Sequence, residues 1–141
     1  MLLQSIGHIG PPSTASPWLR KHIFPGANSP ALSEVFTAVE RVGLWVADLE
    51  FLRLHYAETL SHWCRRFEAN RAEIAKMYGD RFCRMWEFYL ISAEMMFRTG
   101  RSLVFQLQLA RKRDAAPIVR DYITDLQRKY RKTEDLIGEG G

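Results

Sequence analysis

The sequence predicts an α/β fold with about three strands and long helices. Apolar residues of the 141-residue chain alternate in some stretches, as in strands, and recur every three or four residues in others, as in helices. These stretches follow the order strand, helix, strand, two helices, strand. Because a sheet covered by helices normally has more than three strands, the pattern predicts the C-terminal portion of a larger doubly wound domain.

The composition is that of an ordinary globular chain. With 47% hydrophobic and 26% charged residues, it excludes the disordered, collagen-like and disulfide-scaffold classes. No apolar run approaches the ~18 residues of a membrane span, and we expect no signal peptide after Met1. Cys64 and Cys83 are expected to be free thiols, which suits a reducing, cytoplasmic compartment. The net charge of +4 favours an anionic partner, either nucleic acid or a phospholipid surface.

The first third of the chain is expected to hold the end of a strand, a long loop and one helix. Residues 2–6 predict the strand, and residues 1–31 carry five of the six prolines, which indicates a loop over most of that segment. A helix follows from Pro30, because one helical face is apolar at Leu32, Val35, Phe36 and Val39. Gly43 is expected at the C′ position that ends this helix.

Two further strands and two long helices are expected in the rest of the chain. Residues 44–54 are rich in apolar side chains and predict the second strand. One long helix is expected over 56–77, and the next begins near Asp80, a suitable N-cap residue. Residues 102–110 predict the third strand, because leucine or phenylalanine alternates there with other residues.

Three polar side chains on the first long helix form a candidate metal site. His55, Glu58 and His62 lie at offsets of three and seven residues and therefore share one helical face. The chain has no His-Glu-x-x-His motif and offers no obvious fourth ligand. A solvated or hydrogen-bonded polar face is the alternative interpretation.

Basic residues near the C-terminus form a candidate nucleic-acid interface, without any recognised binding motif. They are Arg111, Lys112, Arg113, Arg128, Lys129, Arg131 and Lys132. A run of charges is more often a solvated face than a nucleic-acid interface. Tyr89 is a different kind of candidate, because it lies on an apolar helical face where its hydroxyl needs a structural partner or a ligand.

Six stretches between residues 1 and 123 carry more specific motifs. They are Leu2-Leu3-Gln4-Ser5-Ile6-Gly7, Pro17-Trp18-Leu19-Arg20-Lys21-His22-Ile23-Phe24-Pro25-Gly26, Pro30-Ala31-Leu32-Ser33-Glu34, Leu54-His55-Tyr56-Ala57-Glu58-Thr59-Leu60-Ser61-His62-Trp63, Arg81-Phe82-Cys83-Arg84-Met85-Trp86-Glu87-Phe88-Tyr89-Leu90 and Val104-Phe105-Gln106-Leu107-Gln108-Leu109-Ala110. In their order and spacing, the chain resembles the C-terminal part of the cyclopropane-fatty-acyl-phospholipid synthases and mycolic-acid cyclopropane synthases. These enzymes are S-adenosylmethionine-dependent methyltransferases.

The resemblance implies the C-terminal part of a class I, Rossmann-like methyltransferase sheet. Residues 1–7 would end its fifth strand, 44–54 would form the sixth and 102–110 the seventh. Residues 1–123 would belong to the methyltransferase domain, and 124–141 would be a basic helical or frayed tail. The family's S-adenosylmethionine site lies on earlier strands, so we expect no cofactor-binding residue in this sequence and an isolated chain that is inactive.

The resemblance also implies a reaction, the transfer of a methylene group from S-adenosylmethionine to the double bond of a phospholipid acyl chain. The alkene attacks the sulfonium methyl group, and bicarbonate removes a proton from the resulting cation before the ring closes. Such a cation needs a dry pocket with aromatic walls. Tyr56, Trp86 and Phe88 are the expected lining. Phe24 is expected either where the acyl chain enters or buried as the anchor of its loop.

The bicarbonate ligands of the family correspond here to Gln4, the backbone of Ile6, and Tyr89. Gln4 stands where the family has a histidine. A glutamine can donate a hydrogen bond to an anion, but it carries no charge and transfers no proton. This difference separates the chain from the usual ring-forming members.

The partners implied by the resemblance are phospholipid acyl chains at a membrane surface, which suits the basic excess. We expect the protein to be cytoplasmic, peripheral to the inner face of the membrane, and completed by an N-terminal portion or by a second copy. Nucleic acid is not expected. The alternative function is a non-catalytic, basic membrane- or nucleic-acid-binding module on the same scaffold.

Overall fold

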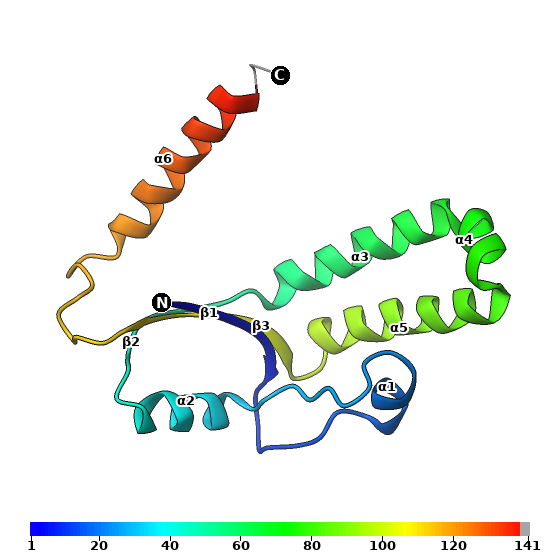
Figure 1. The fold of residues 1–141 in the computed structure, drawn as a ribbon, viewed down its shortest axis with the longest axis horizontal. Coiled ribbons are helices and arrows are strands. Elements are labelled where there is room, and N and C mark those ends of the chain that lie inside the picture. The colour runs from blue at the N-terminus through cyan, green and yellow to red at the C-terminus, as the bar shows by residue number, and fades with distance from the viewer. Residues whose placement is uncertain (139–141) are drawn as a thin grey trace.

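A computed structural model describes residues 1–138 and shows a small sheet accompanied by helices (Figure 1). The strands are β1 (Leu2–His8), β2 (Trp45–Phe51) and β3 (Ser102–Ala110). The helices are α1 (Pro17–His22), α2 (Leu32–Arg41), α3 (Arg53–Ala69), α4 (Arg71–Tyr78), α5 (Asp80–Arg98) and α6 (Asp121–Gly138). In Figure 1, α3 and α5 lie side by side, extend away from the sheet and are joined at their far end by α4. The predicted α/β class, with three strands and long helices, is confirmed.

The last strand of the chain lies between the first two. The order in the sheet is β1-β3-β2, and β3 runs antiparallel to both neighbours. Leu107 of β3 pairs with Leu3 on one side and with Leu49 on the other. Since β1 and β2 both run opposite to β3, they are parallel to each other without being adjacent.

The two faces of the sheet contribute to two separate hydrophobic clusters. Alternate residues of β3 face α2 and pack with Val39 of that helix; they are Leu103, Phe105, Leu107 and Leu109. Their alternation along residues 102–110 was predicted from the sequence and is confirmed. On the opposite face, Val104 joins the cluster formed by α3 and α5. That face also carries Gln106 and Gln108, so it is more polar than the face that packs on α2.

A close contact at Gly7 holds the loop before α2 against β1. Gly7 is buried, and a Cβ atom there would lie 2.9 Å from both Phe105 Cε1 and the carbonyl oxygen of Pro30. The backbone N–H of His8 donates to the same Pro30 oxygen at 3.1 Å. The ring Nδ1 of His8 also lies 3.1 Å from the carbonyl oxygen of Ser29. The absence of a side chain at Gly7 therefore lets the loop cross directly over the strand.

The helix predicted over 56–77 is divided in two at Asn70. The Asn70 side chain donates to the carbonyl of Arg66 at 2.8 Å, while its backbone carbonyl accepts from the N–H of Ile74 at 3.1 Å. Asparagine competes with the backbone for hydrogen bonds and therefore favours such helix ends. The predicted N-cap, Asp80, is instead the first residue of α5, after Gly79.

Two other boundaries differ from the sequence predictions. The second strand ends at Phe51 rather than at residue 54, because the carbonyl of Leu52 accepts from the N–H of Tyr56 at 2.9 Å and begins α3. The short helix α1 lies in the segment predicted as a loop, and the Ser16 side chain accepts from its Leu19 N–H at 3.2 Å. Gly43 follows α2 with φ of 71°, as its predicted C′ role requires.

The helix α6 points away from the sheet in Figure 1. Contacts near its start connect it to the rest of the chain: Arg120 Nε donates to Asp48 Oδ2 at 2.5 Å, and the Tyr122 hydroxyl donates to Gln108 Oε1 at 2.5 Å. Within residues 1–138, no helix is both long and apolar enough to cross a membrane. The final residues of the predicted 124–141 tail, 139–141, lie outside the described residues.

Candidate functional site

Aromatic rings from three segments surround Tyr89 of α5. Its ring centroid lies 5.1 Å from that of Trp86 on the same helix. Phe24, from the loop after α1, packs edge-on against Tyr89 at 5.7 Å. Tyr56, at the start of α3, packs against the same buried hydrophobic cluster as Tyr89. We call Phe24, Tyr56, Trp86 and Tyr89 the aromatic cluster.

Helical spacing and the α1 turn bring these rings together. Trp86 and Tyr89 are three residues apart on α5, and both pack against the buried cluster that contains Leu90 and Leu60. Tyr56 packs on the same cluster, and its ring lies 4.8 Å from that of Phe97. Phe24 is positioned by its own backbone, because its N–H donates to the carbonyl of Leu19 in α1 at 3.0 Å.

Both phenols of the aromatic cluster stay protonated at neutral pH. Burial raises the pKa of Tyr89, and the neighbouring Tyr56 raises it further. Burial alone raises the pKa of Tyr56. Each hydroxyl is therefore a hydrogen-bond donor, and within the described part of the chain neither has a hydrogen-bond partner. A half-buried donor of this kind is available to a ligand.

The two β1 residues expected in the anion site lie on the sheet face that carries Val104. Gln4 pairs with Gln106, and the Gln4 Oε1 accepts from Gln106 Nε2 at 2.5 Å. The Gln4 amide nitrogen therefore remains a possible donor. Ile6 pairs with Val104, the sheet residue of the cluster against which Tyr89 packs. Ile6 is thus opposite the sheet residue that contacts the α3–α5 cluster, and Gln4 lies two residues away, at the next position of β1 on the same face.

Phe88 is separated from the other expected lining residues. It is 56% exposed, and its ring packs edge-on against Trp18 of α1 at 4.8 Å. Phe24 is also partly open to solvent, at 46%. The structure therefore brings Tyr56, Trp86, Tyr89 and Phe24 together, whereas Phe88 belongs to a neighbouring surface.

The polar face of α3 is occupied by ion pairs and hydrogen bonds. Glu58 Oε1 lies 2.7 Å from Arg98 Nη2, and this guanidinium holds the pKa of the Glu58 carboxyl below its usual range. His62 Nδ1 lies 3.1 Å from Arg65 Nη2. Where the structure describes the side chains, no group of three or more metal-ligating residues comes together. The contacts of Glu58 and His62 fit the alternative interpretation of His55, Glu58 and His62 as a hydrogen-bonded polar face.

The basic residues of the candidate nucleic-acid interface lie on two different parts of the structure. Arg111 and Lys112 line a hollow of about 670 Å³ beside β3, whereas Arg128 and Arg131 are exposed on α6. The side chain of Lys132 lies outside the described residues.

Sequence reasoning missed a groove beside the aromatic cluster. It has a volume of about 410 Å³ and is lined by Trp18, His22, Arg81, Arg84, Met85 and Phe88. The spacing of Arg81, Arg84 and Phe88 places them on one face of α5, which is a signal the sequence contained. The contribution of α1 could not be read in the same way, because it depends on how the loop folds.

Comparison with known proteins identifies a family for this chain. The family profile described as mycolic acid cyclopropane synthetase matches residues 1–107. The chain is 39% identical over 97 residues to tuberculostearic acid methyltransferase UfaA1 of Mycobacterium tuberculosis, covering 67% of this chain and 23% of that protein. It is 33% identical over 95 residues to sphingolipid C9-methyltransferase 2 of Gibberella zeae, covering 67% of this chain and 18% of that protein.

A solved structure shares the fold. Mycolic acid cyclopropane synthase CmaA1, complexed with SAH and CTAB, superposes with a TM-score of 0.69 at 24% identity. The match covers 77% of this chain and 43% of that one. The chain described in this structure thus spans about a fifth of the length of the two curated relatives and less than half of the solved one.

Proposed function

Because the chain belongs to the mycolic acid cyclopropane synthetase family, we propose that it forms the acyl-chain-binding wall of a lipid-modifying methyltransferase. The relatives in this family are S-adenosylmethionine-dependent methyltransferases that act on lipid chains. In the specific form of the proposal, a methylene group is transferred to the double bond of a phospholipid acyl chain. The substrate is reached at a membrane surface.

The aromatic cluster is the observation that carries this proposal. Its four rings come from α3, α5 and the loop after α1, and three of them are half-buried. Methyl transfer to an alkene makes the acyl chain electron-deficient, and aromatic faces attract positive charge. A dry wall also keeps water from the reacting carbons. Because their pKa values are raised, Tyr56 and Tyr89 bring no negative charge that would be costly in an apolar site.

An anion site beside this wall is the second part of the proposal. Gln4 retains a free amide donor, Tyr89 retains its hydroxyl, and Ile6 offers a backbone group. These uncharged groups suit a small oxyanion such as bicarbonate, which would accept the proton released by the acyl chain. S-adenosylmethionine supplies an electrophilic methyl group when bound, and we assign its binding to no residue of this chain.

Photo-crosslinking to a phospholipid tests the wall without requiring turnover. The full chain is mixed with vesicles that contain a phosphatidylglycerol with a diazirine at mid-chain. After illumination, peptide mass spectrometry locates the adducts. We expect adducts on residues of the aromatic cluster, and an excess of unlabelled, unsaturated phosphatidylglycerol should remove them.

A matched pair of phenylalanine variants makes this experiment specific. Phe24→Ala removes one ring of the aromatic cluster. Phe51→Ala is the control, because it removes a ring from β2 that is 48% exposed, compared with 46% for Phe24. We expect Phe24→Ala to reduce crosslinking several-fold and Phe51→Ala to leave it unchanged. Equal effects of both variants, or adducts spread over the whole surface, would contradict the proposal. Vesicle binding without adducts on the aromatic cluster would instead favour a non-catalytic membrane module.

A further inference from the structure

The groove between α1 and the first half of α5 combines cationic and aromatic side chains. We call it the α1–α5 groove, and its lining is Trp18, His22, Arg81, Arg84, Met85 and Phe88. The Trp18 ring packs edge-on against Phe88 at 4.8 Å and lies 5.6 Å from the ring of His22. These contacts attach α1 to α5 and leave both arginines exposed.

The two arginines contribute nothing evident to the stability of α5. Arg81 lies in the first turn of the helix, where the positive end of the helix dipole disfavours a cation. Among the residues whose side chains the structure describes, neither Arg81 nor Arg84 forms an ion pair. By contrast, Arg71 of α4 and Arg98 of α5 each contact two glutamates. The unpaired charges of the groove therefore require another explanation.

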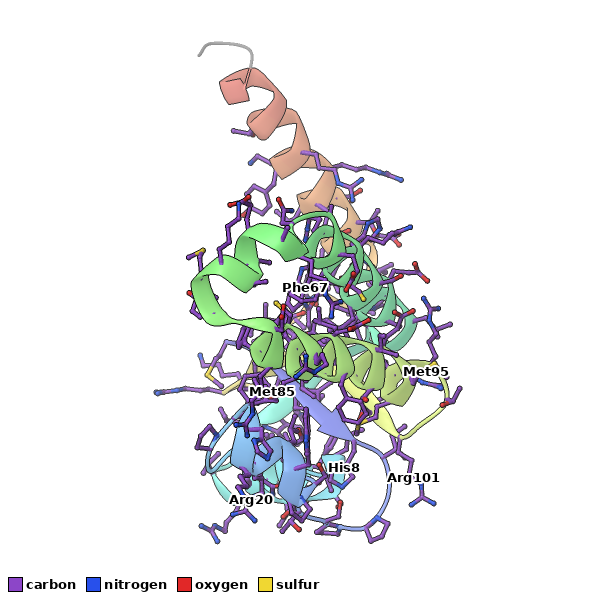
Figure 2. The ribbon with its side chains drawn as sticks, turned by 90° about the vertical axis from the view of Figure 1, so that its right-hand side faces the viewer. His8, Arg20, Phe67, Met85, Met95 and Arg101 are labelled. Atoms are coloured by element: carbon purple, nitrogen blue, oxygen red, sulfur yellow. The ribbon has the colours of Figure 1, made fainter. Side chains whose placement is uncertain are left out.

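Further positive charge surrounds the groove. Arg20 and Lys21 occupy the last turn of α1, are exposed, and form no ion pair within the described residues. In Figure 2 the Arg20 side chain extends from α1 into solvent, below the part of α5 that carries Met85. The nearby Glu87 is already paired with Arg71 at 2.9 Å. The surface is thus complementary to a negatively charged partner.

Apolar side chains continue the groove along α5. Phe88, Ile91 and Met95 follow Arg84 at intervals of four, three and four residues and are exposed by 56%, 48% and 49%. They therefore share one helical face with the arginines. Figure 2 shows α5 crossing the molecule from Met85 to Met95, with this part of the helix toward the viewer. An exposed strip that joins arginines to large apolar residues is typical of a surface that enters a lipid interface.

We propose that the α1–α5 groove is a docking surface for an anionic phospholipid bilayer. Arg81 and Arg84 contact headgroup phosphates, while Trp18 and Phe88 lie in the interfacial layer, which tryptophan favours. This inference rests on the proposed function, because Phe88 adjoins Tyr89 and the loop after α1 carries Phe24. Docking here places the membrane next to the aromatic cluster. Nucleic acid would use the arginines but would leave Ile91 and Met95 without a role.

Vesicle flotation of the full chain tests the docking surface. Vesicles of phosphatidylcholine alone are compared with vesicles containing a large fraction of phosphatidylglycerol. We expect binding only to the anionic vesicles, and weaker binding as salt rises. Arg81→Gln with Arg84→Gln should weaken this binding roughly 30-fold, which corresponds to about 1 kcal/mol for each basic residue at the surface.

The control removes the same charge elsewhere. Arg113→Gln with Arg131→Gln changes two exposed arginines outside the groove, and we expect only a small effect. Phe88→Ser should also weaken binding without affecting the net charge, and circular dichroism verifies that each variant is folded. Equal losses of vesicle binding in the two double variants would overturn the proposal, as would no loss in the groove pair, Arg81→Gln with Arg84→Gln. The proposal would also be overturned if single-stranded RNA or polyglutamate bound as tightly as the vesicles and lost as much affinity when Arg81 and Arg84 are replaced.

Failure of this inference is distinguishable from failure of the proposed function. Flotation measures docking, and the diazirine adducts measure contact between the acyl chain and the aromatic cluster. Adducts on the cluster with no effect of the groove pair on flotation would overturn the docking surface alone. Docking through the groove without adducts would overturn the acyl-chain wall alone.

Discussion

Arg53, at the start of α3, binds the C-terminal end of α5. Its replacement tests how much this contact stabilises the pair of helices that carries Tyr56, Trp86 and Tyr89. Its Nε donates to the carbonyl oxygen of Phe97 at 2.6 Å, and its Nη2 donates to the carbonyl oxygen of Arg98. Both carbonyls lie at the C-terminal end of α5, where a helix has no internal donors and the dipole favours a cation. Arg53 therefore caps α5 from another helix.

The expected effect follows from these two hydrogen bonds. A bond with a charged donor contributes about 1.5–3 kcal/mol, and the lower part of this range applies because Arg53 is only half-buried and water can reach the carbonyls. Arg53→Met keeps the apolar stem and removes both donors. We expect it to lower the free energy of unfolding by about 3–4 kcal/mol. Urea unfolding followed by circular dichroism measures this change.

Arg66→Met, on the same helix, is the matched control. Arg66 is exposed and forms no ion pair among the described residues, so its replacement should change the free energy of unfolding by less than about 0.5 kcal/mol. If Arg53→Met were equally mild, with an unchanged dependence of free energy on urea, the reasoning would be refuted. The capping bonds would then contribute no net stability.

Three other predictions concern packing and pH. Gly7→Ala should lower the free energy of unfolding by about 1–3 kcal/mol, because the new Cβ would lie 2.9 Å from Phe105, and an unchanged urea midpoint would contradict this. The raised pKa of Tyr89 means that its contribution to stability is present at neutral pH and is lost as pH rises through the folded-state pKa. Tyr89→Phe should therefore reduce the loss of stability at alkaline pH, and phenolate absorbance would show whether Tyr89 ionises above the ordinary tyrosine pKa. The lowered pKa of Asp48 beside Arg120 means that their ion pair stabilises the fold above the ordinary carboxyl pKa and is lost as pH falls through the folded-state pKa. Asp48→Asn should therefore make the temperature of unfolding less dependent on acid pH, and an unchanged pH dependence would exclude a role for the pair.

The candidate site was predictable where it depends on local spacing. Trp86 and Tyr89 share a helical face because they are three residues apart, and their partial burial follows from the apolar residues around them. The motifs around these residues also identified the family, which the profile match confirms. Phe88 shows the limit of this reasoning. It directly precedes Tyr89 in α5, but it lies outside the aromatic cluster and its ring packs against Trp18 of α1.

Other parts of the site depend on contacts between distant segments. Phe24 reaches Tyr89 from 65 residues earlier in the chain, through a loop whose course no periodicity describes. The groove depends in the same way on α1, which is too short to give a clear helical pattern. Arg53 could be seen as a basic residue at a helix start, but its two acceptors are at the far end of another helix.

The sequence by itself determined the α/β class, the position of the third strand and its inward-facing residues. These features depend on side-chain alternation and helical spacing, which are local properties of the chain. Only the tertiary structure decided that β3 lies between β1 and β2, and that α1 lies against α5. The physical reason is that such contacts form where distant surfaces bury apolar area together and satisfy one another's hydrogen bonds, and no single segment encodes its partner.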